Sequence, residues 1–153
     1  KQVQSGADVI QIFDSRANLL TKEDLIEFSF NYINSLISAL KLDPITKNIP
    51  VIIFARNPKC NIEELINTSA DCISLFWSMN DLNFEVAKNK VAIQGNLDPK
   101  ILLESDETIK RETYKILERF KEYPGYIFNL GHGITPDISP DKIKYLTNIV
   151  REY

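Results

Sequence analysis

The chain has 153 residues, of which 44% are hydrophobic and 25% charged, and its formal net charge is -3. This length and apolar content suit one ordinary domain with a hydrophobic core, so we expect residues 1–153 to form a single domain. The slightly acidic balance argues against a nucleic-acid-binding or membrane-surface protein, which would carry a basic patch. No apolar run approaches the roughly 20 residues of a membrane span. No basic-then-apolar leader follows Lys1, so we expect a cytoplasmic protein.

Five short apolar runs have the composition of β-strands. None of them alternates polar with apolar residues, as a strand with one face in water does. We therefore expect strands that are covered on both faces, which is typical of a parallel sheet. The runs are residues 9–13, 51–54, 72–75, 91–94 and 126–129.

Capping residues predict where a helix begins after each strand. Side chains of Ser, Thr and Asn accept hydrogen bonds from the free N–H groups of a first helical turn. The helix after Asn80 is expected to turn Leu82 and Val86 inward. The predicted caps are Thr21, Asn61, Asn80, Ser105 and Ser139, and the predicted apolar stripe of the first helix is Leu25, Phe28, Ile33, Leu36, Ile37 and Leu40.

The predicted strands and helices alternate five times along the chain. Such alternation indicates an α/β protein with a parallel sheet, either doubly wound or closed as a (β/α)8 barrel. No Gly-x-Gly-x-x-Gly or Walker sequence follows any predicted strand, which removes the common nucleotide-binding signatures of the wound sheet. Cys60 and Cys72 are too far apart for a Cys-x-x-Cys site, so we expect two buried, reduced thiols and no metal.

In both architectures, functional residues gather beyond the carboxyl ends of the strands. His132 is the only histidine, and a glycine on each side leaves its ring uncrowded. A histidine side chain titrates at about pH 6.5 and suits a proton donor or an anion partner; the alternative is a histidine that only caps a turn. Ser15 lacks the Gly-x-Ser-x-Gly setting of a nucleophile. Its hydroxyl either donates to a substrate carboxylate or satisfies its own turn.

Basic and aromatic side chains lie close to the same strand ends. Arg16 and Arg56 follow the first and second predicted strands, and a guanidinium can clamp a carboxylate with two parallel hydrogen bonds. Most surface arginines bind no ligand, so both interpretations stay open. Phe13 and Trp77 also lie near strand ends, where an aromatic side chain more often belongs to the core.

Two strings of residues carry a resemblance to a known family. Residues 91–99 read Val-Ala-Ile-Gln-Gly-Asn-Leu-Asp-Pro, and residues 128–134 read Phe-Asn-Leu-Gly-His-Gly-Ile. Both are similar to consecutive signatures of the uroporphyrinogen decarboxylase family. Segments within residues 11–20, 50–54 and 75–77 match in the same order. The chain therefore resembles the C-terminal part of that family over nearly its whole length.

The resemblance implies a fold and an activity. The fold is a partial (β/α)8 TIM barrel with about five of its eight β-α units. The activity is that of a carboxy-lyase, which removes carbon dioxide from the four acetate side chains of uroporphyrinogen to give coproporphyrinogen in porphyrin and haem biosynthesis. The resemblance also implies a homodimer of the cytosol or plastid that uses neither a metal nor an organic cofactor.

The resemblance assigns roles to four residues. By motif position, Ser15 and His132 each match a residue that contacts a substrate side chain. Phe13 matches a phenylalanine of the cleft wall. Arg56 takes the place of a basic family residue, and we expect it at the rim of the cleft.

Some positions depart from the family's pattern. Asn18 stands where the family usually has glycine, Arg56-Asn57-Pro58 where it has a Lys-Gly-like turn, and Phe76 where it has the aspartate of Leu-Asp-Trp. The family's Arg-Gln-Ala-Gly-Arg string, its central aspartate and its active-site tyrosine belong to the half that would precede Lys1. We therefore expect the isolated chain to be inactive and to need an N-terminal half.

Two other functions fit parts of the sequence. One is a non-catalytic remnant or split subunit that binds a partner half. The other is that of the zinc-dependent methyltransferases that act on methyl-corrinoid proteins and thiols, which share this barrel. Those enzymes carry His-x-Cys after one late strand and a further cysteine near the last strand, as zinc ligands. Here the two places read Phe54-Ala55-Arg56 and Gly131-His132-Gly133, which disfavours this function.

Overall fold

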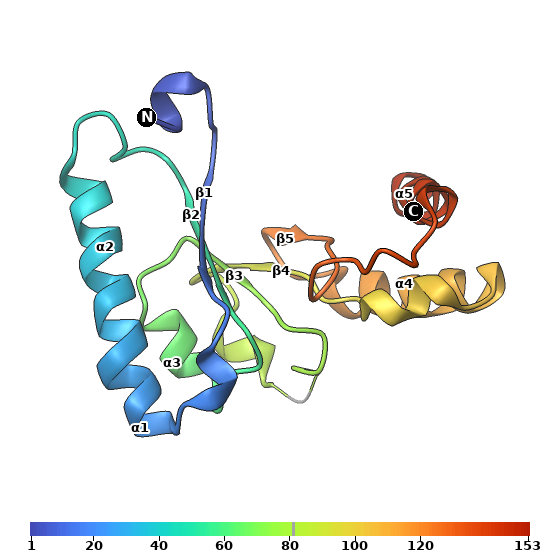
Figure 1. Ribbon diagram of the computed structural model, residues 1–153, viewed down its shortest axis with the longest axis horizontal. Helices are drawn as coiled ribbons and strands as arrows, with labels where there is room; N and C mark the ends of the chain where they lie inside the picture. Colours follow the sequence, from blue (N-terminus) through green and yellow to red (C-terminus); the bar gives the residue numbers. More distant parts are fainter. Residues whose placement is uncertain (81) are drawn as a thin grey trace.

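One sheet of five parallel strands forms the centre of the molecule (Figure 1). The computed structural model describes residues 1–80 and 82–153. The order of the strands in the sheet is their order in the sequence, and every neighbouring pair is parallel. The strands are β1 Ile10–Asp14, β2 Val51–Ala55, β3 Cys72–Ser74, β4 Ala92–Gln94 and β5 Tyr126–Ile127. All five predicted strands are confirmed, with small shifts of their ends.

The strand order decides between the two architectures that the sequence left open. A doubly wound sheet reverses its strand order part-way, which places helices on both faces. Here each connection leads to the next neighbour without reversal, as in a (β/α)8 barrel. In Figure 1, α2 and α3 lie on one side of β1, β2 and β3, and α4 and α5 lie beyond β4 and β5. The sheet is therefore a partial barrel, as predicted.

Helices follow four of the five strands, and their caps match the sequence. Thr21 accepts a hydrogen bond from the backbone N–H of Asp24 at 3.1 Å. Asn61 and Glu64 form a reciprocal capping box at the start of α3. Ser139 caps α5, where Pro140 occupies the first turn. The helices are α1 Lys22–Leu25, α2 Asn31–Leu42, α3 Ile62–Ile66, α4 Asp106–Phe120 and α5 Pro140–Glu152.

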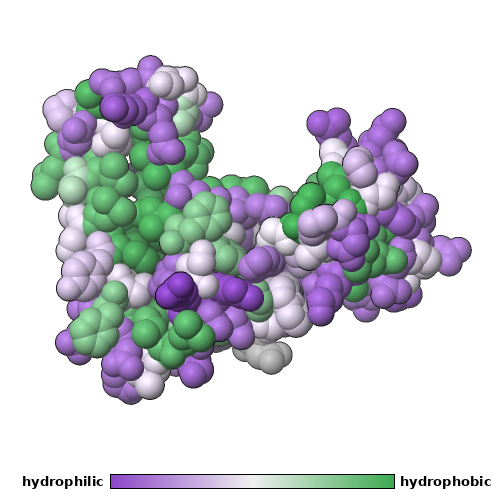
Figure 2. Space-filling model, in the orientation of Figure 1, coloured by the Kyte–Doolittle hydropathy of each residue, from purple (hydrophilic) through white to green (hydrophobic). Residues whose placement is uncertain are grey.

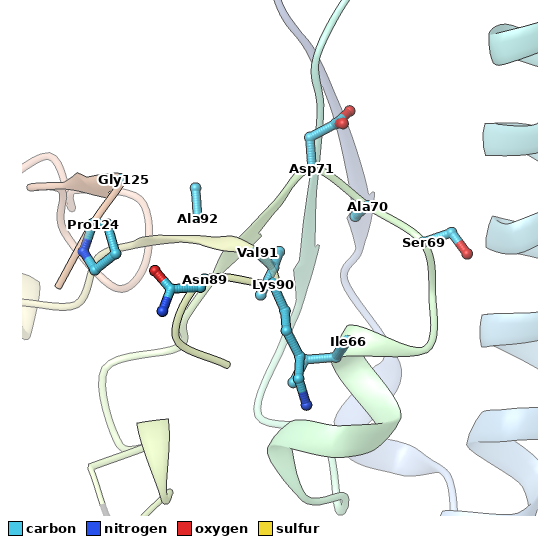
Figure 3. A pocket seen from close by; sticks show the side chains of 10 residues that line it. All are labelled: Ile66, Ser69, Ala70, Asp71, Asn89, Lys90, Val91, Ala92, Pro124 and Gly125. Carbon is cyan, nitrogen blue, oxygen red and sulfur yellow. The ribbon is translucent and has the colours of Figure 1, made fainter. Parts of the chain in front are cut away.

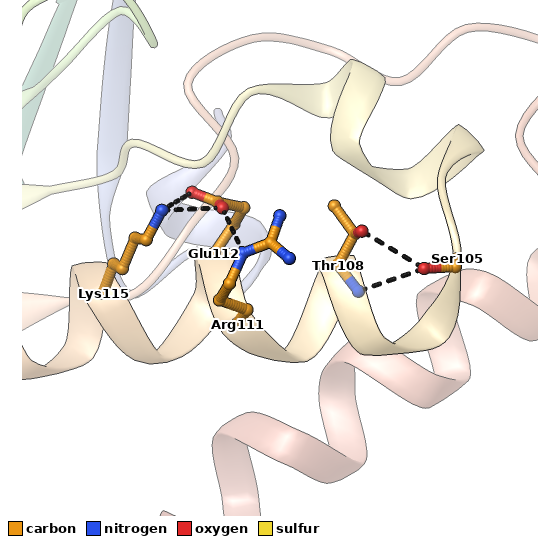
Figure 4. Close-up of polar contacts among 5 residues, drawn as sticks. All are labelled: Ser105, Thr108, Arg111, Glu112 and Lys115. Atoms are coloured by element: carbon orange, nitrogen blue, oxygen red, sulfur yellow. Dashed lines mark hydrogen bonds and ion pairs between the residues drawn. The ribbon is translucent and has the colours of Figure 1, made fainter.

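The start of α4 combines a cap with a charge network on one exposed surface (Figure 4). The Ser105 hydroxyl oxygen accepts from the backbone N–H of Thr108 at 3.3 Å. One turn later, Glu112 accepts from Arg111 and Lys115 at 2.9 and 2.8 Å. The hydrogen bond from Lys115 is the largest cause that holds the pKa of Glu112 below its ordinary value, and Arg111 adds to it. A tertiary contact adds to these local ones, because Asp106 in the first turn of α4 accepts a hydrogen bond from Lys142 of α5 at 2.7 Å.

The predicted stripe of the first helix is wrong at two positions. A π-helical segment, Ile26–Phe30, separates α1 from α2, and its wider turn shifts the side-chain register relative to an α-helix. Phe30 is therefore buried, whereas Phe28 is 59% exposed. Leu36, in α2, is 48% exposed although its neighbour Ile37 is buried. The remaining stripe residues are buried or half-buried as predicted: Leu25, Ile33, Ile37 and Leu40.

The predicted helix that begins at Asn80 is wrong as well. The described residues of this segment contain only one 3₁₀ turn, Phe84–Val86, which Asn83 caps; Asp81 lies outside the described residues. The Asn80 side chain instead accepts hydrogen bonds from Asn96 and Arg119. The Asn80 side chain therefore binds residues of later elements and does not cap a helix.

Burial on both faces holds for the inner strands only. Every residue of β2 and β3 is buried, whereas Phe13 of β1 is 63% exposed and Ile127 of β5 is 44% exposed. The prediction is wrong for β1 and β5 because these strands are the two edges of the sheet, with a neighbour on one side only. Figure 2 shows apolar side chains gathered on the face in view, over the region of β1 and α2. Exposed edges of this kind favour association with another chain.

Two apolar clusters hold the helices to the sheet. The larger cluster joins the strands to α2 and α3, and it includes Ile53, Ile73 and Ile93, which pair across the sheet. The smaller cluster joins α4 and α5 through Ile109 and Leu146. Within residues 1–80 and 82–153, no helix has the length and the apolar character that crossing a membrane requires.

Asp71 ties several elements together at the amino end of the sheet. Its carboxylate accepts from the backbone N–H of Val51 at 2.8 Å and from Lys41 at 2.7 Å. Its own backbone pairs with Val51 and Ala92. It lines a cavity of about 450 Å³ at the start of β3 and β4 (Figure 3). In barrels of this kind the amino end serves stability and the carboxyl end serves function.

Asp71→Ala is expected to destabilise the fold more than Lys41→Ala does. Losing the carboxylate leaves the N–H of Val51, a fully buried residue, without its acceptor, which costs about 1–3 kcal/mol of the free energy of unfolding. Losing the half-buried Lys41 ammonium, which also donates to the Ile49 carbonyl at 3.2 Å, costs about 0–1 kcal/mol, because its other partner Asp71 is partly exposed. Urea denaturation measures both values. Equal losses for the two variants would contradict the assignment.

Candidate functional site

A cleft of about 340 Å³ lies at the carboxyl ends of the strands. We call it the carboxyl-end cleft. Parallel pairing places Phe13 beside Phe54 and Phe54 beside Ser74, so three successive strands contribute to one wall. The loop after β5 supplies the opposite wall. The cleft is lined by Gln11, Phe13, Ser15, Phe54, Ser74 and His132, together with Asn129, Leu130 and Gly133.

The loop after β1 leaves the Ser15 hydroxyl available. The carboxylate of Asp14, the preceding residue, accepts the backbone N–H of Arg16 at 3.0 Å and closes the turn. The Asp14 carbonyl accepts the backbone N–H of Arg56 at 2.9 Å. The Ser15 hydroxyl makes no hydrogen bond with residues 1–80 or 82–153. The turn is therefore satisfied by Asp14 and not by Ser15.

The loop after β5 is placed by backbone pairing with the loop after β4. The N–H of Leu97 donates to the carbonyl of Asn129 at 3.2 Å, and the N–H of Gly131 donates to the carbonyl of Leu97 at 2.8 Å. Gly131 lies against Trp77 so closely that an added Cβ would be 2.5 Å from the Trp77 Cα. Only glycine fits at this position. His132 follows directly and is thereby directed into the cleft.

Aromatic rings support the imidazole of His132. Its ring packs against Phe76 at 5.8 Å with an interplanar angle of 90° and against Phe54 at 6.2 Å with an angle of 68°. Phe54 also contacts Phe13 at 5.9 Å. Edge-to-face contacts of this kind fix ring orientation and contribute about 0.5–1.5 kcal/mol each. Nδ1 lies 3.4 Å from the Gly133 carbonyl, and in the described part of the chain no hydrogen bond reaches Nε2.

Arg56 does not belong to the lining of the carboxyl-end cleft. Its backbone continues the pairing of β2 with β1, and its exposed side chain forms no ion pair with the described residues. The structure thus brings Phe13, Ser15 and His132 together and leaves Arg56 apart from them. Contact of any of the four with a substrate stays a prediction.

Ser74 and Gln94 are buried polar residues of β3 and β4 that were not predicted as site residues from the sequence. Ser74 lines the carboxyl-end cleft, and its hydroxyl accepts from the side-chain amide of Gln94 at 3.0 Å. Both residues are buried, and a buried polar pair is stable only when its hydrogen bonds are made. The signal that could have found them is a polar residue inside an otherwise apolar run of a parallel strand.

The two thiols stay protonated at neutral pH. Burial raises the pKa of Cys60 and of Cys72 to about 12, and both cysteines are free. Cys72 is buried as predicted, whereas Cys60 is half-buried. Among the described residues, no three His, Cys, Asp or Glu side chains are grouped so that they can hold a metal ion.

The sequence and the fold were compared with known proteins. A sequence model of the family described as uroporphyrinogen decarboxylase (URO-D) matches residues 1–153. The chain belongs to this family. A uroporphyrinogen decarboxylase from Vesicomyosocius okutanii is 39% identical over all of this chain and 44% of its own length. Another from Chlorobium limicola is 40% identical over 99% of this chain and 44% of its own length.

The chain spans less than half of the length of these curated relatives. Among solved structures, a methyltransferase from Methanosarcina mazei superposes with a TM-score of 0.73 at 21% identity. The superposition covers 98% of this chain and 43% of that chain. At this identity the likeness shows the fold alone, and it agrees with a partial barrel.

One departure from the family pattern, Phe76, contacts a residue that lines the carboxyl-end cleft. Phe76, at the position where the sequence resemblance led us to expect an aspartate, is buried and packs on His132. The Phe76 and His132 rings meet edge to face. Asn18 lies in the 3₁₀ turn Ala17–Leu19 that follows Ser15 and takes no part in the cleft lining.

Gly131→Ala and Gly133→Ala are expected to behave differently. The first methyl group would overlap the Trp77 backbone, whereas the second would meet nothing within 4 Å. We expect Gly131→Ala to lower the free energy of unfolding by about 1–3 kcal/mol and to move His132. Gly133→Ala serves as the matched control.

Urea denaturation gives the stabilities, and one NMR signal reports the position of the imidazole because the sequence has one histidine. A displaced His132 signal in Gly133→Ala, or an unchanged one in Gly131→Ala, would refute the role of the Trp77 contact.

Proposed function

We propose that this chain forms the C-terminal part of a uroporphyrinogen decarboxylase and supplies one wall of its substrate cleft. The observation that carries the proposal is the meeting of Phe13, Ser15 and His132 in the carboxyl-end cleft of a chain that belongs to this family. The reaction removes the carboxyl groups of four acetate side chains from uroporphyrinogen and gives coproporphyrinogen.

Each residue has a role that its surroundings suit. Phe13 is 63% exposed and offers an apolar ring to the pyrrole rings of the substrate. The free Ser15 hydroxyl donates a hydrogen bond to one substrate carboxylate. His132, held by Phe54 and Phe76, directs Nε2 toward a second carboxylate. These residues bind and orient the substrate.

The chemistry itself depends on protonation of the pyrrole ring. The bond between the acetate methylene and its carboxyl carbon breaks, and its electron pair passes into the protonated ring as carbon dioxide leaves. A proton then adds to the methylene carbon, which becomes a methyl group, and the ring releases the proton that it had taken up. The protein has to hold acids and carboxylate partners in a dry cleft for these steps.

The remaining parts of the active site are proposed to come from an N-terminal half that residues 1–153 do not contain. The open edges of the sheet at β1 and β5, together with a length below half of the relatives', support this. We propose that residues 1–153 act as one unit with that half, in a cytoplasmic homodimer that acts in haem biosynthesis.

A non-catalytic role is the second candidate. The exposed Phe13 and Ile127 suit a split subunit that only completes a partner's barrel. A corrinoid or thiol methyltransferase is not supported, because neither cysteine ligand of such a site stands in Phe54-Ala55-Arg56 or Gly131-His132-Gly133 and the likeness to a methyltransferase is one of fold alone.

The chain alone is expected not to decarboxylate uroporphyrinogen. Positioning contributes up to roughly 7–11 kcal/mol of barrier reduction, and Ser15 and His132 by themselves position only part of the substrate. The assay incubates the chain with uroporphyrinogen, oxidises the products and separates porphyrins by carboxyl number. We expect products only when the N-terminal half of a relative is added, and fewer of them with His132→Ala.

Partly decarboxylated products from the purified chain alone would refute this prediction. Absence of products from every assembled pair that folds would favour the non-catalytic role.

Arg56→Ala is expected to weaken porphyrin binding by less than about fivefold, since an exposed ion pair contributes about 0–1 kcal/mol. Ser15→Ala removes a hydrogen bond to a charged group and is expected to weaken binding by about tenfold or more. Fluorescence titration of the assembled protein with uroporphyrin compares the two. A larger loss of uroporphyrin affinity from Arg56→Ala than from Ser15→Ala would contradict this prediction and indicate that Arg56 contacts the ligand.

A further inference from the structure

We propose that Asp14 is a positioning residue, which fixes Ser15 in the carboxyl-end cleft and keeps its own negative charge away from a carboxylate ligand. The ligand part of this inference rests on the proposed function. The geometric part rests on hydrogen bonds that involve only this chain.

Three hydrogen bonds hold Asp14 from three directions. Carboxylate Oδ1 accepts from the backbone N–H of Arg16 at 3.0 Å. Carboxylate Oδ2 accepts from the hydroxyl of Ser29 at 2.6 Å. The backbone carbonyl accepts from the N–H of Arg56 at 2.9 Å. The loop, the helix that covers β1 and the neighbouring strand therefore all meet at this one residue.

The partner of Oδ2 comes from the π-helical segment Ile26–Phe30. Ser29 is 8% exposed, and the wider turn of this segment changes which side chains face the sheet. A π-helical turn inside an α-helix is rare and occurs often at functional sites. The π-helical turn thus places the Ser29 hydroxyl where it donates to the Asp14 carboxylate.

In this arrangement the Asp14 carboxylate stabilises the loop, and the Ser15 hydroxyl is available to a ligand. A serine in a turn commonly satisfies the turn itself, but here Asp14 has taken that task and Ser15 makes no hydrogen bond with the described residues. A carboxylate beside the cleft would repel a polycarboxylate ligand. Both carboxylate oxygens of Asp14 instead accept donors from the loop and the helix, which lowers the negative potential that reaches the ligand.

The first test needs no ligand. NMR spectra of the chain compare Asp14→Ala, Asp14→Asn and Ser29→Ala. We expect Asp14→Ala to shift the amide signals of Ser15 and Arg16 and to speed the exchange of the Arg16 amide. Asp14→Asn should restore both, since its side-chain oxygen can accept the same hydrogen bond. Ser29→Ala leaves the carboxylate in place and should give a smaller shift.

Asp43→Ala is the matched control. Asp43 accepts the N–H of Ile45 at 2.7 Å in the same kind of turn, far from the carboxyl-end cleft. Its loss should leave the Ser15 and Arg16 signals unchanged. Unchanged Ser15 and Arg16 signals in a folded Asp14→Ala variant would overturn the proposal, and so would an equal response to Asp43→Ala. Should Asp14→Ala not fold, an unaltered spectrum of Ser29→Ala would overturn it.

The second test measures binding of uroporphyrin I, a stable octacarboxylate, by fluorescence. We expect Asp14→Ala to weaken binding by about 3- to 10-fold, the effect of one lost hydrogen bond, and to have no further effect in a Ser15→Ala background. Asp14→Asn should restore the affinity. Losses from Asp14→Ala and Ser15→Ala that simply add would overturn the positioning role, because non-additivity marks residues that act through one another.

The two tests separate the two proposals. If the unaltered chain, alone and with an added N-terminal half, binds no uroporphyrin, the proposed function fails. The amide signals of Ser15 and Arg16 then decide the geometric part alone.

Discussion

Parallel pairing in a single register brings one row of side chains to the carboxyl end of the sheet. At paired positions of parallel strands the side chains point to the same face, so the row forms one surface and the following loops start from the same level. Ser15 and His132 are far apart in the sequence and meet for this reason. A slip of one residue would turn every member of the row to the opposite face. The row consists of Phe13, Phe54, Ser74, Gln94 and Ile127.

The two ends of the sheet carry different kinds of polar interaction. At the amino end, the Asp71 carboxylate is satisfied by Val51 and Lys41 and holds strands together. At the carboxyl end, the Ser15 hydroxyl and the Nε2 atom of His132 make no hydrogen bond with residues 1–80 and 82–153. A binding site requires groups that the fold leaves unsatisfied, so the stabilising contacts have to lie elsewhere. In the loop after β1, Asp14 provides them.

Helix-capping residues and hydrophobic periodicity predicted most helices and strands. These predictions were wrong where contacts between distant segments compete with the local interactions. The capping box at Asn61 formed because its partner is only three residues away. Asn80 did not cap a helix, since Asn96 and Arg119 from later elements bind its side chain. The exposure of Phe28 could not be predicted either, because helical periodicity assumes a constant turn and the π-helical segment breaks it. Ser74 was missed because its burial depends on neighbouring strands.

The sequence by itself determined the strand runs, four helix caps and, through the strings at residues 91–99 and 128–134, the family. These features depend on residues close together in the chain. The tertiary structure decided the strand order, the exposure of the edge strands and the meeting of Ser15 with His132. It also decided that Asp14 and not Ser15 satisfies the turn, because the donor from Ser29 comes from a separate element. Pairing between distant segments follows from the packing of the whole sheet, and no local pattern encodes it.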